Sequence, residues 1–290
     1  MFSRSVVIYG LIILAVIPLI NRNKIKAAFS LRETKSAVES FPYLLELQET
    51  KEKVDVGKIN QLIDYYQGVV AYFPERADGY SILGFCYFHE GNINEAIENF
   101  IKSIEINSDV IWFYYNLGQI YFHLGEYQKA LQWFNQGIRT KPQRTLDFIA
   151  SSKEIYWPII GNNGNFMKLK PRLLRGYKET YQWAVMSLVK LNQYSEILSL
   201  SDRAIKLNFD DDGFFSFWAS WAFYQDNQYD QSKKFLRVSL NKSHVLANLD
   251  YNEDFKQKAL HGLFKENSAY AKELYKVFSL EKADVKLKLF

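Results

Sequence analysis

Two adjacent segments decide the fold of this chain, because the second repeats the first: ADGYSILGFCYFHEGNINEAIENFIKSIEINSDV (residues 77–110) and IWFYYNLGQIYFHLGEYQKALQWFNQGIRTKPQ (residues 111–143). Seven side chains recur at a spacing of 34 residues. These are Tyr80, Leu83, Gly84, Tyr87, Gly91, Ala96 and Phe100, which return as Tyr114, Leu117, Gly118, Tyr121, Gly125, Ala130 and Phe134. A period of this length is typical of helix–turn–helix units that stack in a row.

Small residues in the repeat indicate where its two helices meet. Gly84 and Ala96 are expected at the crossing of a helical hairpin, where a larger side chain would push the backbones apart, and their counterparts one repeat later are equally small. Gly91 and Gly125 are expected at the turns, because the C-terminus of a helix favours a left-handed residue. A single hairpin cannot bury its apolar face alone, so we expect the units to stack.

These two segments resemble the tetratricopeptide repeat (TPR) family. Its pattern has a bulky residue at position 4, Leu-Gly at 7 and 8, Tyr at 11, Ala at 20, an aromatic residue at 24, a small residue at 27 and Pro at 32. Residues 111–143 follow this pattern as far as Pro142, whereas Ser108 replaces the proline in the preceding unit. The resemblance implies an all-α fold, a TPR-like helical-hairpin solenoid.

Weaker repeats flank this pair. Residues 58–74 are expected to form the second helix of an earlier unit, residues 178–211 and 213–246 two degenerate units, and residues 252–280 a closing pair of helices. The resulting division of the chain is a membrane anchor (1–27), a connector (28–57), a TPR array (58–142), an irregular helix and loop (144–177), degenerate hairpins with a cap (178–280) and a tail (281–290).

Charge is concentrated at the N-terminus. The 290 residues carry a net charge of +4, but residues 1–35 alone contribute +5, so the rest of the chain is close to neutral. A near-neutral body argues against nucleic acid as a partner, because binding to phosphates needs a concentrated basic face. The single cysteine, Cys86, excludes an internal disulfide framework and is expected to be an inert buried thiol.

The N-terminal segment is expected to be an uncleaved transmembrane helix. Residues 5–20, SVVIYGLIILAVIPLI, contain no charge and eleven Val, Ile or Leu residues. A cleaved signal peptide and a buried core helix are the alternatives, although no small-residue cleavage site precedes Arg22. We expect a bacterial inner membrane. The bases that follow the span favour a body on the cytoplasmic side, with a periplasmic body as the alternative.

The resemblance also implies a partner-binding groove on the first helix of each unit. The side chains that would line it are Ser81, Phe85, Phe88, His89, Trp112, Tyr115, Gln119, Phe122 and His123. Its aromatic character suits an apolar segment of another protein, unless these rings pack on the chain's own flanking helices instead. A variant of the fold that grips the C-terminal carboxylate of chaperones is rejected, because only Asn116 matches its residues.

Other segments carry little chemistry. The aromatic run at residues 214–224 is apolar on all sides and is expected in the core, and Asp210, Asp211 and Asp212 are expected to cap the helix that follows. No phosphate-binding loop, nucleophile motif or metal-ligand set is found, so no cofactor and no metal are expected. Residues 285–290 alternate apolar and basic side chains, which suggests a frayed tail or an arm that joins a partner's sheet.

The sequence therefore predicts a non-catalytic protein. We interpret it as a membrane-tethered scaffold for protein–protein interaction, a structural or assembly component of a multiprotein envelope machine such as a secretion system, a pilus or a flagellar motor. An assembly chaperone that shields an apolar segment of a client is the alternative. An enzyme would need a cluster of catalytic groups that the sequence does not contain.

Overall fold

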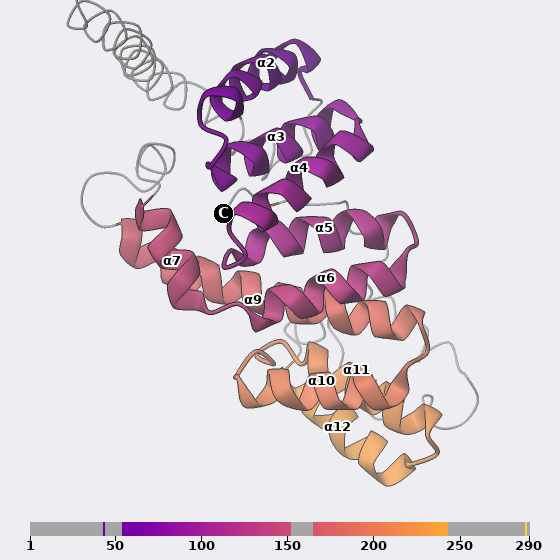
Figure 1. Ribbon diagram of the computed structural model, residues 1–290. Coiled ribbons are helices and arrows are strands. Elements are labelled where there is room, and N and C mark those ends of the chain that lie inside the picture. Colours follow the sequence, from indigo (N-terminus) through magenta and orange to yellow (C-terminus); the bar gives the residue numbers. More distant parts are fainter. Residues whose placement is uncertain (1–42, 44–53, 152–164, 243–287, 289–290) are drawn as a thin grey trace, which may run out of the picture. The chain divides into compact units, whose positions relative to one another are not determined.

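The computed structural model describes Tyr43, residues 54–151, residues 165–242 and Lys288, and the secondary structure of this part of the chain is helical (Figure 1). Its helices are α2 (Val56–Tyr72), α3 (Ala77–Glu90), α4 (Ile93–Ile106), α5 (Ile111–His123), α6 (Tyr127–Arg139), α7 (Pro142–Ser151), α9 (Asn165–Lys190), α10 (Tyr194–Lys206), α11 (Phe214–Gln225) and α12 (Tyr229–Lys242). The expectation of an all-α chain of helical hairpins is confirmed for these residues.

The chain forms two compact units. Among the described residues, the N-terminal unit comprises Tyr43 and residues 54–108, 146–151 and 165–168, and the C-terminal unit comprises residues 109–145, 169–242 and Lys288. The N-terminal unit therefore holds α2, α3 and α4, while the C-terminal unit holds α5, α6, most of α9, and α10 to α12.

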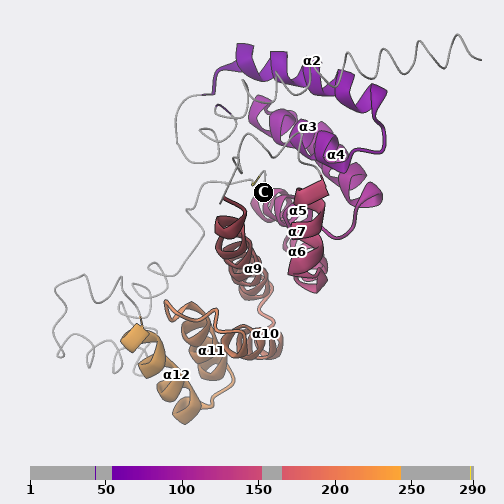
Figure 2. The same ribbon diagram turned by 90° about the vertical axis from the view of Figure 1, so that its left-hand side faces the viewer.

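In the N-terminal unit, α3 packs antiparallel to α4 and also contacts α2 (Figure 2). The crossing of α3 and α4 lies at Gly84, where a Cβ atom would approach the ring of Phe100 to 3.0 Å and the carbonyl oxygen of Ala96 to 3.1 Å. The predicted small-residue contact is therefore confirmed. Leu62, Tyr66 and Val69 of α2 are buried, as expected of the second helix of an earlier unit.

In the C-terminal unit the same contact recurs between α5 and α6. A Cβ atom at Gly118 would overlap the ring of Phe134, so only glycine fits this position. The crossing of α11 and α12 is held by hydroxyl groups instead of a glycine. Ser220 donates to the carbonyl of Ser232, and Ser232 donates to the carbonyl of Ser220, each at 2.8 Å.

The hairpin turns share one hydrogen-bonding pattern. In the two strong repeats the N–H of Asn92 donates to the backbone carbonyl of Tyr87, and the N–H of Glu126 donates to that of Tyr121, at 2.9 Å each. This bond closes a helix when the preceding residue is left-handed, and Gly91 (φ 99°) and Gly125 (φ 77°) are indeed left-handed. In the degenerate hairpins Asn192 and Asn227 take this conformation, with φ of 55° and 59°.

The structure departs from the predicted boundaries after Pro142. Helix α9 begins at Asn165, so the segment expected to be irregular up to residue 177 is helical from that point. Pro171 lies inside α9. Proline inside a helix removes one backbone hydrogen bond, and its ring crowds the preceding turn.

Several expectations lie outside the described residues. They are the anchor at residues 5–20, most of the connector, and the closing helices at residues 252–280. Within the described residues, none of the helices has both the length and the apolar character to cross a bilayer.

Candidate partner-binding site

The predicted contact residues of the N-terminal unit lie on α3. Ser81 and Phe85 are buried, whereas Phe88 and His89 are half-buried. The imidazole of His89 packs on both rings, with centroids 4.5 Å from Phe85 and 5.5 Å from Phe88. Phe88 and His89 are thus the accessible part of the predicted face in this unit.

Burial also fixes the protonation state of two groups on α3. It lowers the pKa of the His89 imidazole to about 4, so this side chain is neutral at physiological pH. Burial raises the pKa of the Cys86 thiol, and the side chain is fully enclosed. The expectation that Cys86 is a buried thiol is confirmed.

The predicted contact residues of the C-terminal unit lie on α5, and most are covered. Trp112, Tyr115, Gln119 and Phe122 are each no more than 5% exposed, while His123 is half-buried.

Helix α9 provides much of this cover. A Cβ atom at Gly176 would come within 3.0 Å of the indole nitrogen of Trp112. Farther along, the ring of Trp183 meets Phe122 edge-on at 4.9 Å and His123 at 5.9 Å. Trp112 and Phe122 therefore pack on the chain's own helix α9, as one of the two alternatives expected. The role of the face in binding a partner stays a prediction.

Between these two covered ends, Lys288 lies against α5. Its backbone N–H donates to Oδ1 of Asn116, and its carbonyl accepts from Nδ2 of the same side chain, both at 2.7 Å. Its ammonium lies 4.9 Å from the centre of the Tyr115 ring and forms an ion pair with Glu179 of α9. The tail was expected to be frayed or to join a partner's sheet, and neither alternative anticipates this contact.

Burial affects the charge of Lys288. Its enclosure, together with the nearby Arg175 guanidinium, lowers the pKa of the ammonium to about 7. Glu179 acts in the opposite direction, because an adjacent carboxylate favours the charged form. The ammonium is therefore charged below pH 7, where its pairing with Glu179 is strongest.

Gln119 lies one helical turn beyond Asn116 and differs from it in one respect. Its side chain is fully buried, yet neither its amide nitrogen nor its amide oxygen has a hydrogen-bond partner. Buried amides are almost always paired, and an unpaired one costs free energy. Sequence reasoning placed Gln119 on the contact face but gave no sign that its amide is unpaired.

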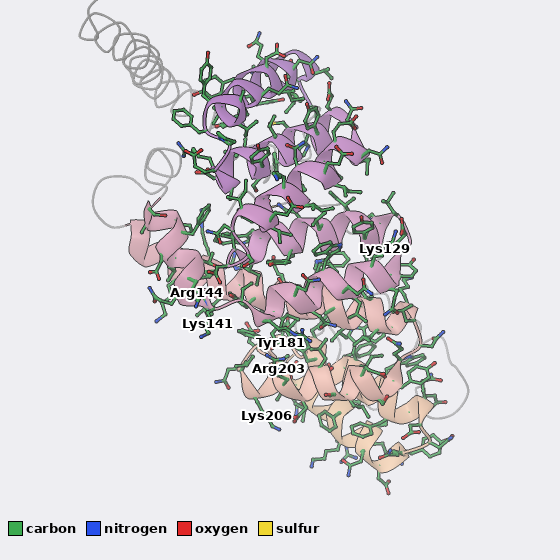
Figure 3. The ribbon with its side chains drawn as sticks, in the orientation of Figure 1. Lys129, Lys141, Arg144, Tyr181, Arg203 and Lys206 are labelled. Atoms are coloured by element: carbon green, nitrogen blue, oxygen red, sulfur yellow. The ribbon has the colours of Figure 1, made fainter. Side chains whose placement is uncertain are left out.

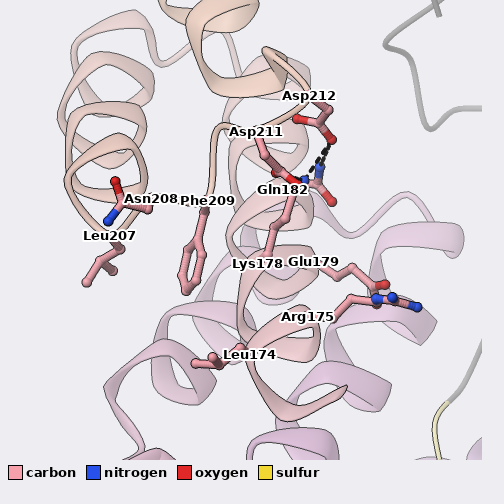
Figure 4. Close-up of a pocket in the computed structure, with 10 residues that line it drawn as sticks. All are labelled: Leu174, Arg175, Lys178, Glu179, Gln182, Leu207, Asn208, Phe209, Asp211 and Asp212. Carbon is pink, nitrogen blue, oxygen red and sulfur yellow. Dashed lines mark hydrogen bonds and ion pairs between the residues drawn. The ribbon is translucent and has the colours of Figure 1, made fainter. Parts of the chain in front are cut away.

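A cleft of about 600 Å³ opens beside Glu179, between α9 and the segment that follows α10 (Figure 4). Lys178 forms ion pairs there with Asp211 and, at 2.9 Å, with Asp212. Burial opposes the charging of Lys178, but the two carboxylates outweigh it and raise its pKa. The charged groups of Lys178, Asp211 and Asp212 thus satisfy one another.

Of the three acidic residues predicted to cap α11, Asp210 and Asp212 do so, whereas Asp211 pairs with Lys178. Asp210 is 3% exposed and accepts from the N–H groups of Phe215 and Ser216 at 2.8 and 3.1 Å, and Asp212 accepts from the N–H of Phe214. Lys242 of α12 pairs with Asp210 at 3.1 Å. In the described residues no group of three or more His, Cys, Asp or Glu side chains is arranged to hold a metal ion.

The aromatic run on α11 belongs to the core, as predicted. Phe214, Phe215, Phe217 and Trp218 are each no more than 4% exposed and pack among residues of α6, α9 and α10. On the neighbouring hairpin the guanidinium of Arg203 lies 5.7 Å from the Tyr181 ring, which ties α10 to α9 (Figure 3).

Comparison with known proteins identifies the repeats. Residues 75–143 match the model of the tetratricopeptide repeat family. No curated protein sequence matches the chain. Among solved structures, the crystal structure of MamA protein is similar at 15% identity and a TM-score of 0.50, over 78% of this chain and 98% of that one. This similarity supports the fold alone.

Two further structures match with lower scores. The P58(IPK) TPR domain has 14% identity and a TM-score of 0.32, over 87% of this chain and 67% of that one. YrrB, described as a TPR protein with an unusual peptide-binding site, has 15% identity and a TM-score of 0.28, over 63% and 95%. The hairpin geometry and the family match thus agree over residues 75–143, which are similar to tetratricopeptide repeats.

Proposed function

We propose that this chain is a non-catalytic scaffold that binds other proteins through its helical repeats and is tethered to a membrane by residues 5–20. The observation that carries the proposal is the pair of repeats at residues 75–143, whose hairpins close through Gly84 and Gly118. Stacked hairpins of this type present extended helical surfaces that suit protein or peptide partners.

The N-terminal unit offers the accessible part of the contact face. Phe88 and His89 lie next to each other at the end of α3 and are half-buried. Aromatic side chains that are held in place yet remain accessible are frequent energetic anchors of interfaces. The near-neutral charge beyond residue 35 favours a protein partner over nucleic acid.

The proposed tether rests on sequence alone. Residues 5–20 are free of charge, and Arg22, Lys24 and Lys26 follow them directly. Bases beside a span stay on the cytoplasmic side, so we place the body in the cytoplasm of a bacterial cell, on the inner membrane, with the periplasm as the alternative. A repeat array on an anchor suits a structural or assembly component of a secretion system, a pilus or a flagellar motor.

A pull-down of the full chain in mild detergent tests this function. The wild-type chain should retain a protein partner in stoichiometric amount, and Phe88→Glu should lose it while circular dichroism shows unchanged helicity. Leu124→Glu is the matched control, since Leu124 is 51% exposed in a turn outside the contact face. Equal retention by both variants would contradict the assigned face, and a partner absent from the mature assembly would indicate a chaperone.

A further inference from the structure

Asn116 holds the backbone of Lys288 in the way that a neighbouring strand would. Its side-chain amide donates to the carbonyl and accepts from the N–H of one and the same residue, at 2.7 Å in both directions. An extended residue points its N–H and C=O to the same side, which is why strands exchange this pair of bonds. The contact involves only backbone atoms of the ligand residue, so it recognises an extended chain rather than a particular side chain.

The side chain of Lys288 meets a separate set of groups. Its ammonium pairs with Glu179 and lies over the face of Tyr115 at 4.9 Å, and the lysine side chain is only 16% exposed. A cation that leaves water needs a carboxylate or an aromatic face to compensate for lost hydration. Glu179 and Tyr115 supply both and oppose the repulsion from Arg175, so we assign this part of the site to a basic residue.

Gln119 shows that the site extends beyond Lys288. It follows Asn116 by one turn of α5, is fully buried, and leaves both of its amide groups without partners. A second peptide unit of an extended ligand would satisfy these groups in the same way that Lys288 satisfies Asn116. The unpaired amide is therefore an unused position for backbone recognition.

We propose that Tyr115, Asn116, Gln119 and Glu179 form a binding site for an extended peptide segment that carries a lysine, that Lys288 is the internal ligand of this site, and that a protein partner binds by presenting the same chemistry in its place. The inference rests on the proposed function and deepens it, because it names the kind of partner. An internal ligand has an effective concentration of up to about millimolar, so an external segment competes poorly while Lys288 is bound.

The test measures binding of a fluorescent peptide to the full chain by anisotropy, slightly below pH 7. The peptide has the sequence of residues 283–290, Ala-Asp-Val-Lys-Leu-Lys-Leu-Phe. It should bind Lys288→Ala at least about tenfold more tightly than the wild type, because the internal competitor is weakened. Lys206→Ala is the matched control: it removes the same charge from the same unit, at a residue that forms an exposed ion pair with Asp202. It should behave like the wild type.

Reversing the charge of Glu179 and of the peptide residue that it would pair with distinguishes a loss of binding from a loss of folding. Glu179 is 29% exposed in its side chain, so Glu179→Lys leaves the core intact. In the background of Lys288→Ala, this variant should lose the lysine peptide and bind a peptide with glutamate at the position of Lys288. If the peptide binds all chains equally, or binds none of them, the proposal is overturned.

Two further outcomes separate this inference from others. If the wild-type chain is a dimer that Lys288→Ala converts to a monomer, Lys288 serves a second copy and the internal ligand is refuted. If no chain binds the peptide but the pull-down partner is still lost with Phe88→Glu, the inference fails while the scaffold function stands.

Discussion

At the scale of single residues, the glycines at the helix crossings tolerate a larger side chain least. Gly118→Ala is expected to destabilise the protein by about 1–3 kcal/mol, because the new methyl group would overlap the ring of Phe134. Gly57→Ala is the matched control, since Gly57 lies exposed in the first turn of α2 with only the Asp55 carboxylate nearby. There, alanine should be neutral or stabilising by up to about 1 kcal/mol. Urea unfolding measures both, and equal effects would contradict the assigned helix crossing.

His89 gives the protein a pH dependence that can be calculated in sign. Its pKa is about 4 in the folded chain and 6.5 when exposed, so the unfolded chain takes up a proton first as the pH falls. The free energy of unfolding is therefore unaffected by the titration of His89 above pH 6.5. It falls by about 1–3 kcal/mol between pH 6.5 and pH 4 because of this half-buried group. His89→Phe should show a shallower loss of unfolding free energy over this window, and identical slopes would refute the assignment.

At the scale of elements, the hairpin is stable because of how its ends and crossing are built. Asp210→Ala is expected to cost about 2–4 kcal/mol, because it removes the cap of α11 and leaves Lys242 without its buried partner. Asp211→Ala should cost less than about 1 kcal/mol, since its side chain is 74% exposed in its pair with Lys178. Hydrogen exchange of α11 and α12 should rise in the first variant only.

The sequence was sufficient to predict the strong hairpins but not all of the weak ones. Gly84 and Gly118 could be assigned to helix crossings because a glycine that recurs at the same position of each repeat indicates a place where a larger side chain does not fit. In the pair α11 and α12 the same crossing uses Ser220 and Ser232, whose mutual hydrogen bonds replace the close contact of glycine with an aromatic ring. Asn192 and Asn227 take, in the weak hairpins, the left-handed turn conformation that Gly91 and Gly125 take in the strong ones. Their spacing could have revealed these turns, because asparagine tolerates the left-handed conformation.

The candidate site was predicted only in part for a physical reason. Helical periodicity assigns a face to Trp112 and Phe122, but it cannot say which distant helix covers that face. The cover depends on Gly176 and Trp183 of α9, which begins earlier than expected. Likewise, Asn116 was the only match to a known carboxylate clamp, so nothing in the sequence indicated that it binds a backbone, and the structure shows that the backbone it binds is that of Lys288.

At the scale of the whole molecule, the proposed cytoplasmic position of the body can be tested with a thiol reagent. Cys86 is fully buried and its thiol pKa is raised, so it should not react with a maleimide reagent. Lys206→Cys introduces an exposed thiol at a residue whose side chain is 74% exposed. In intact spheroplasts an impermeant maleimide should leave this variant unlabelled until the membrane is opened. Labelling before that would place the body in the periplasm.

The proposed scaffold function requires that the accessible end of α3, at Phe88 and His89, is a surface for another protein. Photo-crosslinking in cells tests it most directly, with a photoreactive phenylalanine analogue placed at Phe88 or at Leu124 of the full chain. We expect one protein to be crosslinked from position 88 and none from position 124, which is exposed but lies outside the contact face. A crosslink of equal yield at both positions, or at neither, would contradict the account.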